Sequence, residues 1–147
     1  MISLTSIGPK RKREHEDFLV EEYLKRTGRV AKAEHLWVET ESSFWEMLEK
    51  RRARTPTRVI LMDSTGALLT SSAFAAAIGH LRDVGTQNIV VGVGGADGWT
   101  AEARARADLL VSMGNLTLPH SLARVVAAEQ IYRAMTILTG HPYHIGH

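Results

Sequence analysis

Apolar residues recur along the chain with two different periods, and the two patterns alternate from one end to the other. Short apolar runs, typical of buried strands, occupy five segments: residues 1–7, 33–39, 58–62, 88–93 and 108–113. Apolar residues at helical spacing occupy five others: residues 14–27, 43–54, 74–81, 100–107 and 121–139. Strands that alternate with helices predict a single α/β domain over residues 1–147, with a mostly parallel sheet and helices on both faces.

Local signals place several boundaries of these elements. Ser43 is expected to cap a helix, because Glu46 three residues later completes a capping box. Residues 64–66, Ser-Thr-Gly, predict a turn directly after the third strand. Ser121 is a candidate cap for the last helix, and Gly140 is expected to end it.

Composition narrows the class of protein. The chain is 44% hydrophobic and 23% charged, as in ordinary globular domains, and it has no apolar run long enough to span a membrane. Without cysteine there is no disulfide framework, thiolate zinc site or cysteine nucleophile. The N-terminal residues lack the pattern of a secretory signal, so we expect a cytoplasmic protein.

Charge is distributed unevenly along the chain. Residues 1–58 hold 13 Lys and Arg against 10 Asp and Glu, whereas residues 59–147 hold 5 against 6. A basic run at residues 10–13 is either a solvated loop or a contact for phosphates, and Arg51, Arg52 and Arg54 are candidates to extend it. The three tryptophans are core residues or stacking surfaces for bases, namely Trp37, Trp45 and Trp99, the last of which is expected near the mouth of a site.

Three glycine-bearing loops follow predicted strands, where open parallel sheets usually bind their ligands. They are residues 62–66, 92–98 and 113–120. The middle loop fails the dinucleotide fingerprint, because Asp97 stands where the third glycine belongs. It remains either a nucleoside site without a phosphate cradle or a tight turn. The leucine-rich third loop should be buried against a ligand, another subunit or its own domain.

Two further groups of residues have candidate chemistry. Glu129 and Arg133 are spaced i, i+4 on the most apolar helix, where they form either an exposed ion pair or a pair near an interface or a site. Three histidines in the C-terminal tail, His141, His144 and His147, have the residue type of metal ligands but no carboxylate to help them. We therefore expect no metal site there, and instead a tail that folds over a site.

Several segments together resemble the RlmH family, small SPOUT-class methyltransferases that modify N3 of a pseudouridine in large-subunit (23S) ribosomal RNA. The matching segments are Val-Gly-Val-Gly-Gly-Ala-Asp-Gly at 91–98, the run from Leu116 to Ala134, and His-Pro-Tyr-His at 141–144. Residues 7–10 and 21–26 are also similar to that family. The resemblance is strong from residue 88 to 144 and weak over residues 33–58.

The resemblance implies a C-terminal trefoil knot, an S-adenosylmethionine cofactor, an obligate homodimer and action on the assembled ribosome. It implies that the cofactor contacts eight residues: Met62, Gly94, Met113, Gly114, Asn115, Leu116, Thr117 and Leu118. It also implies that the tail reaches the partner's cofactor site, with four residues near the target base: Glu129, Arg133, Tyr143 and His144. Ile145 departs from the family, whose members often have a basic residue there.

Methyl transfer from a sulfonium is an in-line displacement that needs no metal, but the acceptor N3 must lose its proton. We therefore expect His144 as a candidate base and Arg133 as a candidate stabiliser of the anion. The alternative functions are a non-catalytic nucleotide-binding module and a ribosome-associated protein that uses the basic N-terminal surface.

Overall fold

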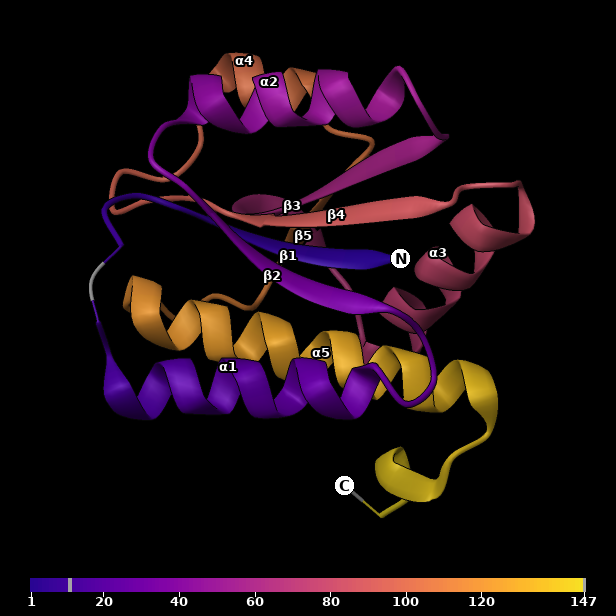
Figure 1. Ribbon diagram of the computed structural model, residues 1–147. Coiled ribbons are helices and arrows are strands. Elements are labelled where there is room, and N and C mark those ends of the chain that lie inside the picture. Colours follow the sequence, from indigo (N-terminus) through magenta and orange to yellow (C-terminus); the bar gives the residue numbers. More distant parts are fainter. Residues whose placement is uncertain (11, 147) are drawn as a thin grey trace.

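The computed structural model describes residues 1–10 and 12–146 (Figure 1). Its elements follow the predicted alternation of strands and helices. In chain order they are β1 (Ile2–Ile7), α1 (Glu14–Thr27), β2 (Ala33–Val38), α2 (Glu41–Arg52), β3 (Thr57–Leu68), α3 (Ser71–Asp83), β4 (Asn88–Val93), α4 (Ala101–Arg106), β5 (Leu109–Ser112), α5 (His120–Thr139) and the 3-10 turn η1 (Pro142–His144).

The five strands form one parallel sheet in the order β2-β1-β4-β3-β5. The N-terminal strand therefore lies inside the sheet, between β2 and β4, and all six of its residues are buried. Because every strand runs in the same direction, the carboxyl ends of the strands meet at one edge. This edge is on the left in Figure 1, where α5 begins.

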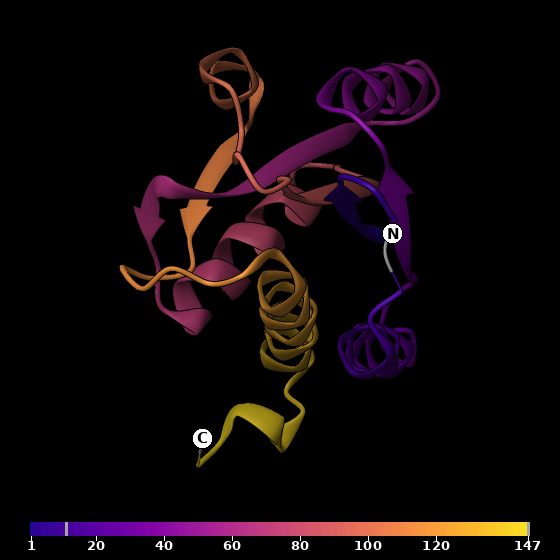
Figure 2. The ribbon, with the colours of Figure 1, turned by 90° about the vertical axis from the view of Figure 1, so that its left-hand side faces the viewer.

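Helices cover both faces of the sheet, as predicted. Figure 2 shows α2 and α4 on one face and α1, α3 and α5 on the other. The larger core joins the sheet to α1, α3 and α5 around residues such as Leu4, Ile60 and Ile131. The smaller core packs α2 and α4 on the sheet through the rings of Phe44, Trp45 and Trp99 and their aliphatic neighbours.

The predicted turn at residues 64–66 is wrong, because β3 continues through it to Leu68. The strand shifts its register between Met62 and Ala67 and then pairs again with β5. Gly66 permits this second pairing, since a Cβ there would lie 2.5 Å from the backbone of β5 at Leu110. The Ser-Thr-Gly sequence therefore marks a bulge inside a strand rather than its end.

Two predicted helix caps are also wrong. Thr40, not Ser43, caps α2, and its hydroxyl accepts a hydrogen bond from the backbone N–H of Ser43. In α5 the N-cap is Pro119, which has no side-chain cap hydrogen bond, so Ser121 lies inside the helix. The predicted stop at Gly140 is confirmed, with φ of 74° at that residue.

None of the helices in residues 1–10 and 12–146 is both long enough and apolar enough to cross a lipid bilayer. The trefoil knot remains a prediction from the family resemblance.

Candidate functional site

A cavity of about 190 Å³ lies at the carboxyl ends of the central strands. It is bordered by the bulge of β3 that begins at Met62, by the loop after β4 and by the loop after β5. Its lining includes four of the predicted cofactor residues, namely Met62, Gly94, Met113 and Leu118. Its walls are mostly apolar side chains and glycine backbone, which is a suitable environment for a nucleoside.

Trp99 holds two of these loops together. Its indole Nε1 donates a hydrogen bond of 3.0 Å to the backbone carbonyl of Met62, and its ring is buried. A Cβ at Gly94 would lie 3.2 Å from the same indole nitrogen. Trp99 therefore lines the cavity as a buried ring rather than at its mouth, and the lack of a side chain at Gly94 lets the indole pack closely against the loop after β4.

The predicted cofactor residues after β5 do not all face this cavity. Gly114 lines a neighbouring cavity of about 270 Å³, which also shares Met62 and Met113. Asn115, Leu116 and Thr117 are exposed and line neither cavity. Leu116 is 87% exposed, so the expected cover for this apolar loop does not come from its own domain.

Asp63 is a residue of this site that sequence reasoning did not single out. It follows Met62 along β3, lines the same cavity, and its side chain is only 5% exposed. Its carboxylate accepts hydrogen bonds from Arg104 Nε at 2.9 Å and from the hydroxyl of Thr65 at 2.7 Å. The signal in the sequence was its position directly after the strand predicted at residues 58–62.

A second group of polar side chains lies on the C-terminal half of α5. Glu129 accepts a hydrogen bond of 2.9 Å from Arg133 Nε, and Arg133 Nη2 forms an ion pair with the same carboxylate oxygen at 2.6 Å. The tail folds back onto this pair, where Tyr143 donates its hydroxyl to Glu129 at 3.1 Å and His144 Nδ1 lies 3.0 Å from Arg133 Nη1. The structure thus brings together the four residues expected near the target base, and we call them the α5 cluster.

The protonation of the α5 cluster follows from these contacts. The hydrogen bond to Glu129 raises the pKa of Arg133. Burial and the Glu129 carboxylate raise the pKa of Tyr143 to about 12, so its hydroxyl keeps its proton at neutral pH. Arginine has no acceptor atom, so His144 Nδ1 must accept from Arg133, and a neutral ring then has its proton on Nε2.

Aromatic side chains that sequence reasoning did not assign to a site support the tail. The ring of Tyr132 meets that of Tyr143 edge-on, with centroids 4.6 Å apart, and Tyr23 from α1 lies 6.1 Å from Tyr132. Tyr23 belongs to the segment 21–26 that is similar to the RlmH family. That similarity was the sequence signal that could have indicated a role for Tyr23 beside the tail.

The cofactor cavity and the α5 cluster are far apart within one chain. His120 lines the cavity at the start of α5, and Arg133 follows it thirteen residues later. At a rise of 1.5 Å per residue, these positions are about 20 Å apart along the helix axis. One chain therefore holds two separate groups of predicted site residues, which we refer to as the two half-sites of the predicted active site.

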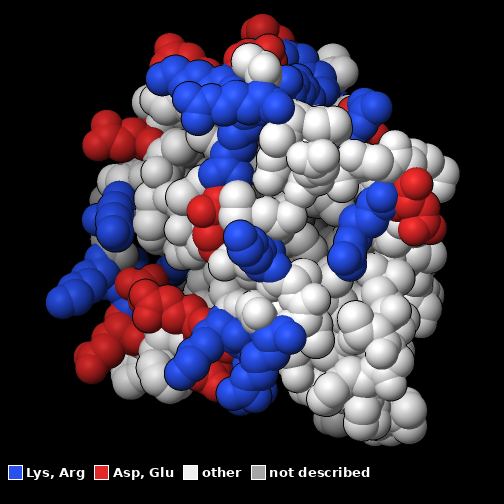
Figure 3. Space-filling model, turned by 45° about the vertical axis from the view of Figure 1, so that its right-hand side comes forward, with Lys and Arg blue, Asp and Glu red and all other residues white. Residues whose placement is uncertain are grey.

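The tail itself has no charged residue between His141 and Gly146. Figure 3 shows charged side chains on the upper and the lower left parts of one face, and none on its lower right part. The charge of the α5 cluster therefore comes from the helix. Within residues 1–10 and 12–146 no group of three or more His, Cys, Asp or Glu side chains is placed to hold a metal, and His147 lies outside the described residues.

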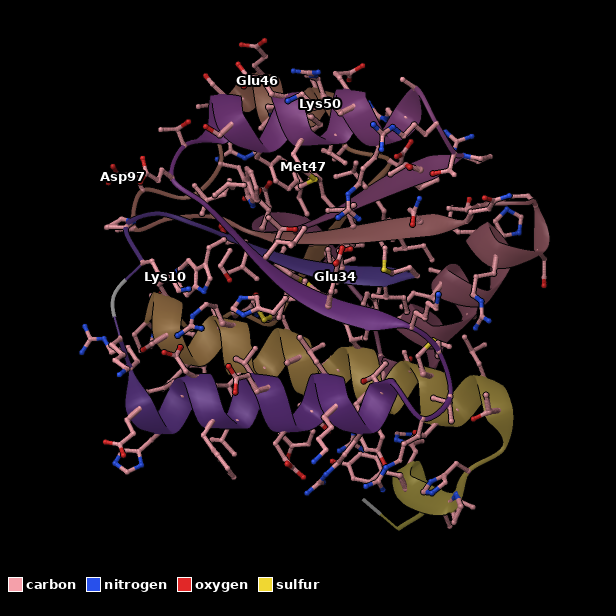
Figure 4. The ribbon with its side chains drawn as sticks, in the orientation of Figure 1. Lys10, Glu34, Glu46, Met47, Lys50 and Asp97 are labelled. Carbon is pink, nitrogen blue, oxygen red and sulfur yellow. The ribbon has the colours of Figure 1, made fainter. Side chains whose placement is uncertain are left out.

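The other sequence candidates are separated by the fold. Arg51 and Arg52 lie on α2, where they pair with Glu34 and Glu49. Figure 4 shows α2 on the opposite face of the sheet from Lys10, so these arginines do not extend the basic run. Arg11 of that run lies outside the described residues. Trp45 is in the smaller core, and Trp37 is half-buried on β2.

Comparison with known proteins finds a matching family model and related sequences. The family model described as "Predicted SPOUT methyltransferase" matches residues 1–144. The Ribosomal RNA large subunit methyltransferase H of Koribacter versatilis is 45% identical over 129 residues, which cover 88% of each chain. The protein of the same name from Brucella ovis is 52% identical over 86 residues, 58% of this chain and 51% of that protein.

Solved structures share the fold at low sequence identity. The SpoU methyltransferase AviRb from Streptomyces viridochromogenes, in complex with its cofactor AdoMet, matches with a TM-score of 0.54 and 12% identity over 93% of this chain and 57% of that one. The A. aeolicus TrmH/SpoU tRNA modifying enzyme matches with a TM-score of 0.56 and 13% identity, over 95% and 77%.

Proposed function

The chain belongs to the SPOUT methyltransferase family, and from this premise we propose that it transfers a methyl group from S-adenosylmethionine to N3 of a pseudouridine in large-subunit ribosomal RNA. The name and the 45% identity of the Koribacter relative over 88% of both chains support this substrate class. The observation that carries the proposal is the pair of half-sites, one shaped for a nucleoside cofactor and one rich in hydrogen-bond donors.

The residues around the cavity fit S-adenosylmethionine. The cavity combines apolar walls at Met62, Met113 and Leu118 with the backbone of Gly94, where a Cβ would crowd Trp99. Such walls exclude water, and a glycine lets the backbone approach an adenine edge closely. The cofactor supplies an electrophilic methyl group on a sulfonium. The chain positions that methyl group at the carboxyl edge of the sheet.

The α5 cluster supplies the means to stabilise an anion. N3 of the base attacks through a lone pair that it gains when its proton leaves, and negative charge then spreads onto the neighbouring carbonyl oxygens. Arg133 has a fixed positive charge, Tyr143 has a hydroxyl donor, and His144 has a donor at Nε2. We assign these groups to the anion, because donors aimed at developing charge commonly make the largest single contribution to catalysis.

In this arrangement His144 serves as a donor rather than as the base. Its Nδ1 accepts from Arg133 and its Nε2 carries the ring proton, so the ring can take up a further proton only at Nδ1, after it releases Arg133. Glu129 is also engaged, because it accepts from Arg133, Tyr143 and the amide of Gln130. The proton of N3 therefore leaves to water. The α5 cluster assists this step, because its donors stabilise the anion and so lower the pKa of N3.

The complete site takes one half-site from each of two chains. Reacting atoms must approach to about 3–3.5 Å, whereas the half-sites of one chain are about 20 Å apart. Exposed apolar side chains support a partner chain beside α1 and α5, namely Phe18, Leu19, Leu116 and Leu122. We therefore propose a homodimer in which the tail of one protomer covers the cofactor cavity of the other.

The proposed substrate is the assembled ribosome, which places the enzyme in the cytoplasm. The test is to map the methylated nucleotide by mass spectrometry in ribosomes from cells with and without the protein. When the protein is added to the unmodified ribosomes with labelled S-adenosylmethionine, tritium should be transferred to that same nucleotide. A chain that binds the cofactor but transfers no tritium would instead be a binding module, and the proposal would be wrong.

A further inference from the structure

A third cavity adjoins the cofactor cavity at the beginning of α5. Its volume is about 320 Å³, and it shares Gly95, Ala96 and His120 with the cofactor cavity. Its other walls come from the end of β1, from Trp37 on β2 and from the segment before α1. Neither the cofactor nor the α5 cluster accounts for it.

Arg124 is the buried charge in the wall of this cavity. Its side chain is 1% exposed, its Nη2 lies 3.0 Å from Asp17 Oδ1, and its guanidinium carbon lies 4.8 Å from the centre of the Trp37 ring. Within residues 1–10 and 12–146, its Nε and Nη1 have no hydrogen-bond partner. Unsatisfied donors on a buried arginine are costly, so a ligand that accepts from them would be strongly favoured.

The N-terminus of α5 opens into the same cavity. The N-cap Pro119 and the first residues His120 and Ser121 all line it. No side chain caps this end, and the first turn has no acidic residue, although the helix is 20 residues long. The free N–H groups and the positive end of the helix dipole therefore favour an anion at this position.

The charges around the cavity also favour an anion. Arg13 lines the cavity, and Figure 4 shows Lys10 at the same edge of the molecule, beside the start of α5. Although burial alone would raise it, the pKa of Asp17 is lowered by the backbone N–H of Arg13 and by Arg124, so this carboxylate is ionised and offsets one cation. Burial lowers the pKa of His35 to about 4, so that ring is neutral. Of the charged side chains that line the cavity or contact Arg124, two are cations and one is an anion, which leaves a net positive charge in the cavity wall.

We infer that this cavity binds a backbone phosphate of the RNA substrate, next to the nucleotide that is methylated. The inference rests on the proposed function for the identity of the RNA. The phosphate oxygens would accept from one of the two unpartnered donors of Arg124, Nε or Nη1, and from the first N–H groups of α5, with Arg13 at the mouth. A phosphate is favoured over other anions because its several oxygens can accept from the buried guanidinium and from the helix N–H groups together, and because the cavity opens beside the methyl-transfer site.

The first test separates the donor geometry of Arg124 from its charge. Arg124→Lys keeps a cation for Asp17 but removes the two unpartnered donors, so it should fold. We expect the KM for unmodified ribosomes to rise about tenfold or more. The affinity for S-adenosylmethionine, measured by calorimetry, should not change. A fall in cofactor affinity would assign Arg124 to the cofactor and overturn the inference.

The second test uses the exposed mouth of the cavity, where folding is not at risk. Arg13→Gln should reduce the slope of log KM against log salt by about one, as expected when one phosphate contact is lost. The matched control is Lys50→Gln, which removes one exposed cation from α2 on the opposite face (Figure 4). If both variants change the slope equally, the cavity makes no specific phosphate contact and the inference fails.

A third measurement does not depend on methyl transfer. The Nε–H resonance of Arg124, observed by NMR in phosphate-free buffer, should shift on addition of a short single-stranded RNA and not in Arg124→Lys. This result would support the cavity even if the wild-type protein modified no ribosome and the proposed function failed. A shift with inorganic phosphate but none with RNA would overturn the RNA source, and no shift with either would overturn the site.

Discussion

The two half-sites of this chain are built in opposite ways. The cofactor cavity draws on three loops that are distant in sequence, and it consists largely of backbone, glycine and apolar side chains. The α5 cluster draws on one helix and the tail that follows it, and it consists of side chains linked by hydrogen bonds. The cavity therefore depends on the sheet that aligns its loops, whereas the cluster depends on the identity of a few side chains.

The largest expected effect concerns the cluster. In Arg133→Ala the methyl-transfer rate should fall about 10²- to 10³-fold, because the fixed cation that stabilises the anion is lost. The affinity for S-adenosylmethionine should stay near that of the wild type, since the residues that line the cavity are unchanged and Arg133 is assigned to the target base. Tritium transfer and calorimetry measure the two quantities separately.

The matched control for that experiment is Arg54→Ala, an exposed arginine after α2 on the other face of the sheet. It should leave both quantities unchanged. Wild-type activity in Arg133→Ala would remove Arg133 from the mechanism and would leave the cluster a structural tie between α5 and the tail.

The next effect tests whether the half-sites come from different chains. Leu118→Glu places a charge in the cofactor cavity, and Arg133→Ala disables the cluster, so each homodimer should be nearly inactive. After unfolding and refolding together in equal amounts, half of the dimers should be mixed, and one of their two sites should combine both intact halves. The mixture should regain about a quarter of wild-type activity. No gain above the separate variants would show that each site lies within one chain.

A smaller effect concerns the backbone on which the cavity depends. Gly66→Ala places a Cβ against the backbone of β5, which has no flexible group to move aside, and should lower the free energy of unfolding by about 3 kcal/mol. Gly95→Ala is the control, because its Cβ would meet its nearest neighbour at an ordinary 3.5 Å. Denaturant unfolding compares the two. Equal stabilities would mean that β3 does not need its second pairing with β5.

The smallest effect concerns how the free energy of unfolding depends on pH, through His35 on β2 near Arg124. Burial and the nearby Arg124 hold the pKa of His35 at about 4, below the 6.5 expected in the unfolded chain. Between these values the unfolded chain binds more protons, so stability should fall as the pH falls from about 6.5 to 4, by at most roughly 3 kcal/mol. His35→Gln should flatten this part of the curve, and the exposed control His80→Gln should not. An unchanged curve in His35→Gln would show that other groups cause the acid sensitivity.

Sequence reasoning placed the strands, the helices and the pairing of Glu129 with Arg133, because each of these depends on local spacing. It missed the continuation of β3 past residues 64–66, because a bulge and a turn use the same small residues. It also missed Asp63 with Arg104, and Tyr23 with Tyr132, because these contacts depend on how distant segments pack. The knot and the dimer entered only through the resemblance, since no local pattern encodes either.

The length of α5 has a consequence for how such a protein can change over time. Each added residue would lengthen the helix by 1.5 Å and turn everything beyond it by about 100°. A single inserted alanine between the two half-sites would therefore swing the tail away from its partner, even though alanine suits a helix well. The middle of α5 is buried in the core, and its residue count is a further constraint that insertions and deletions cannot alter without misplacing the tail.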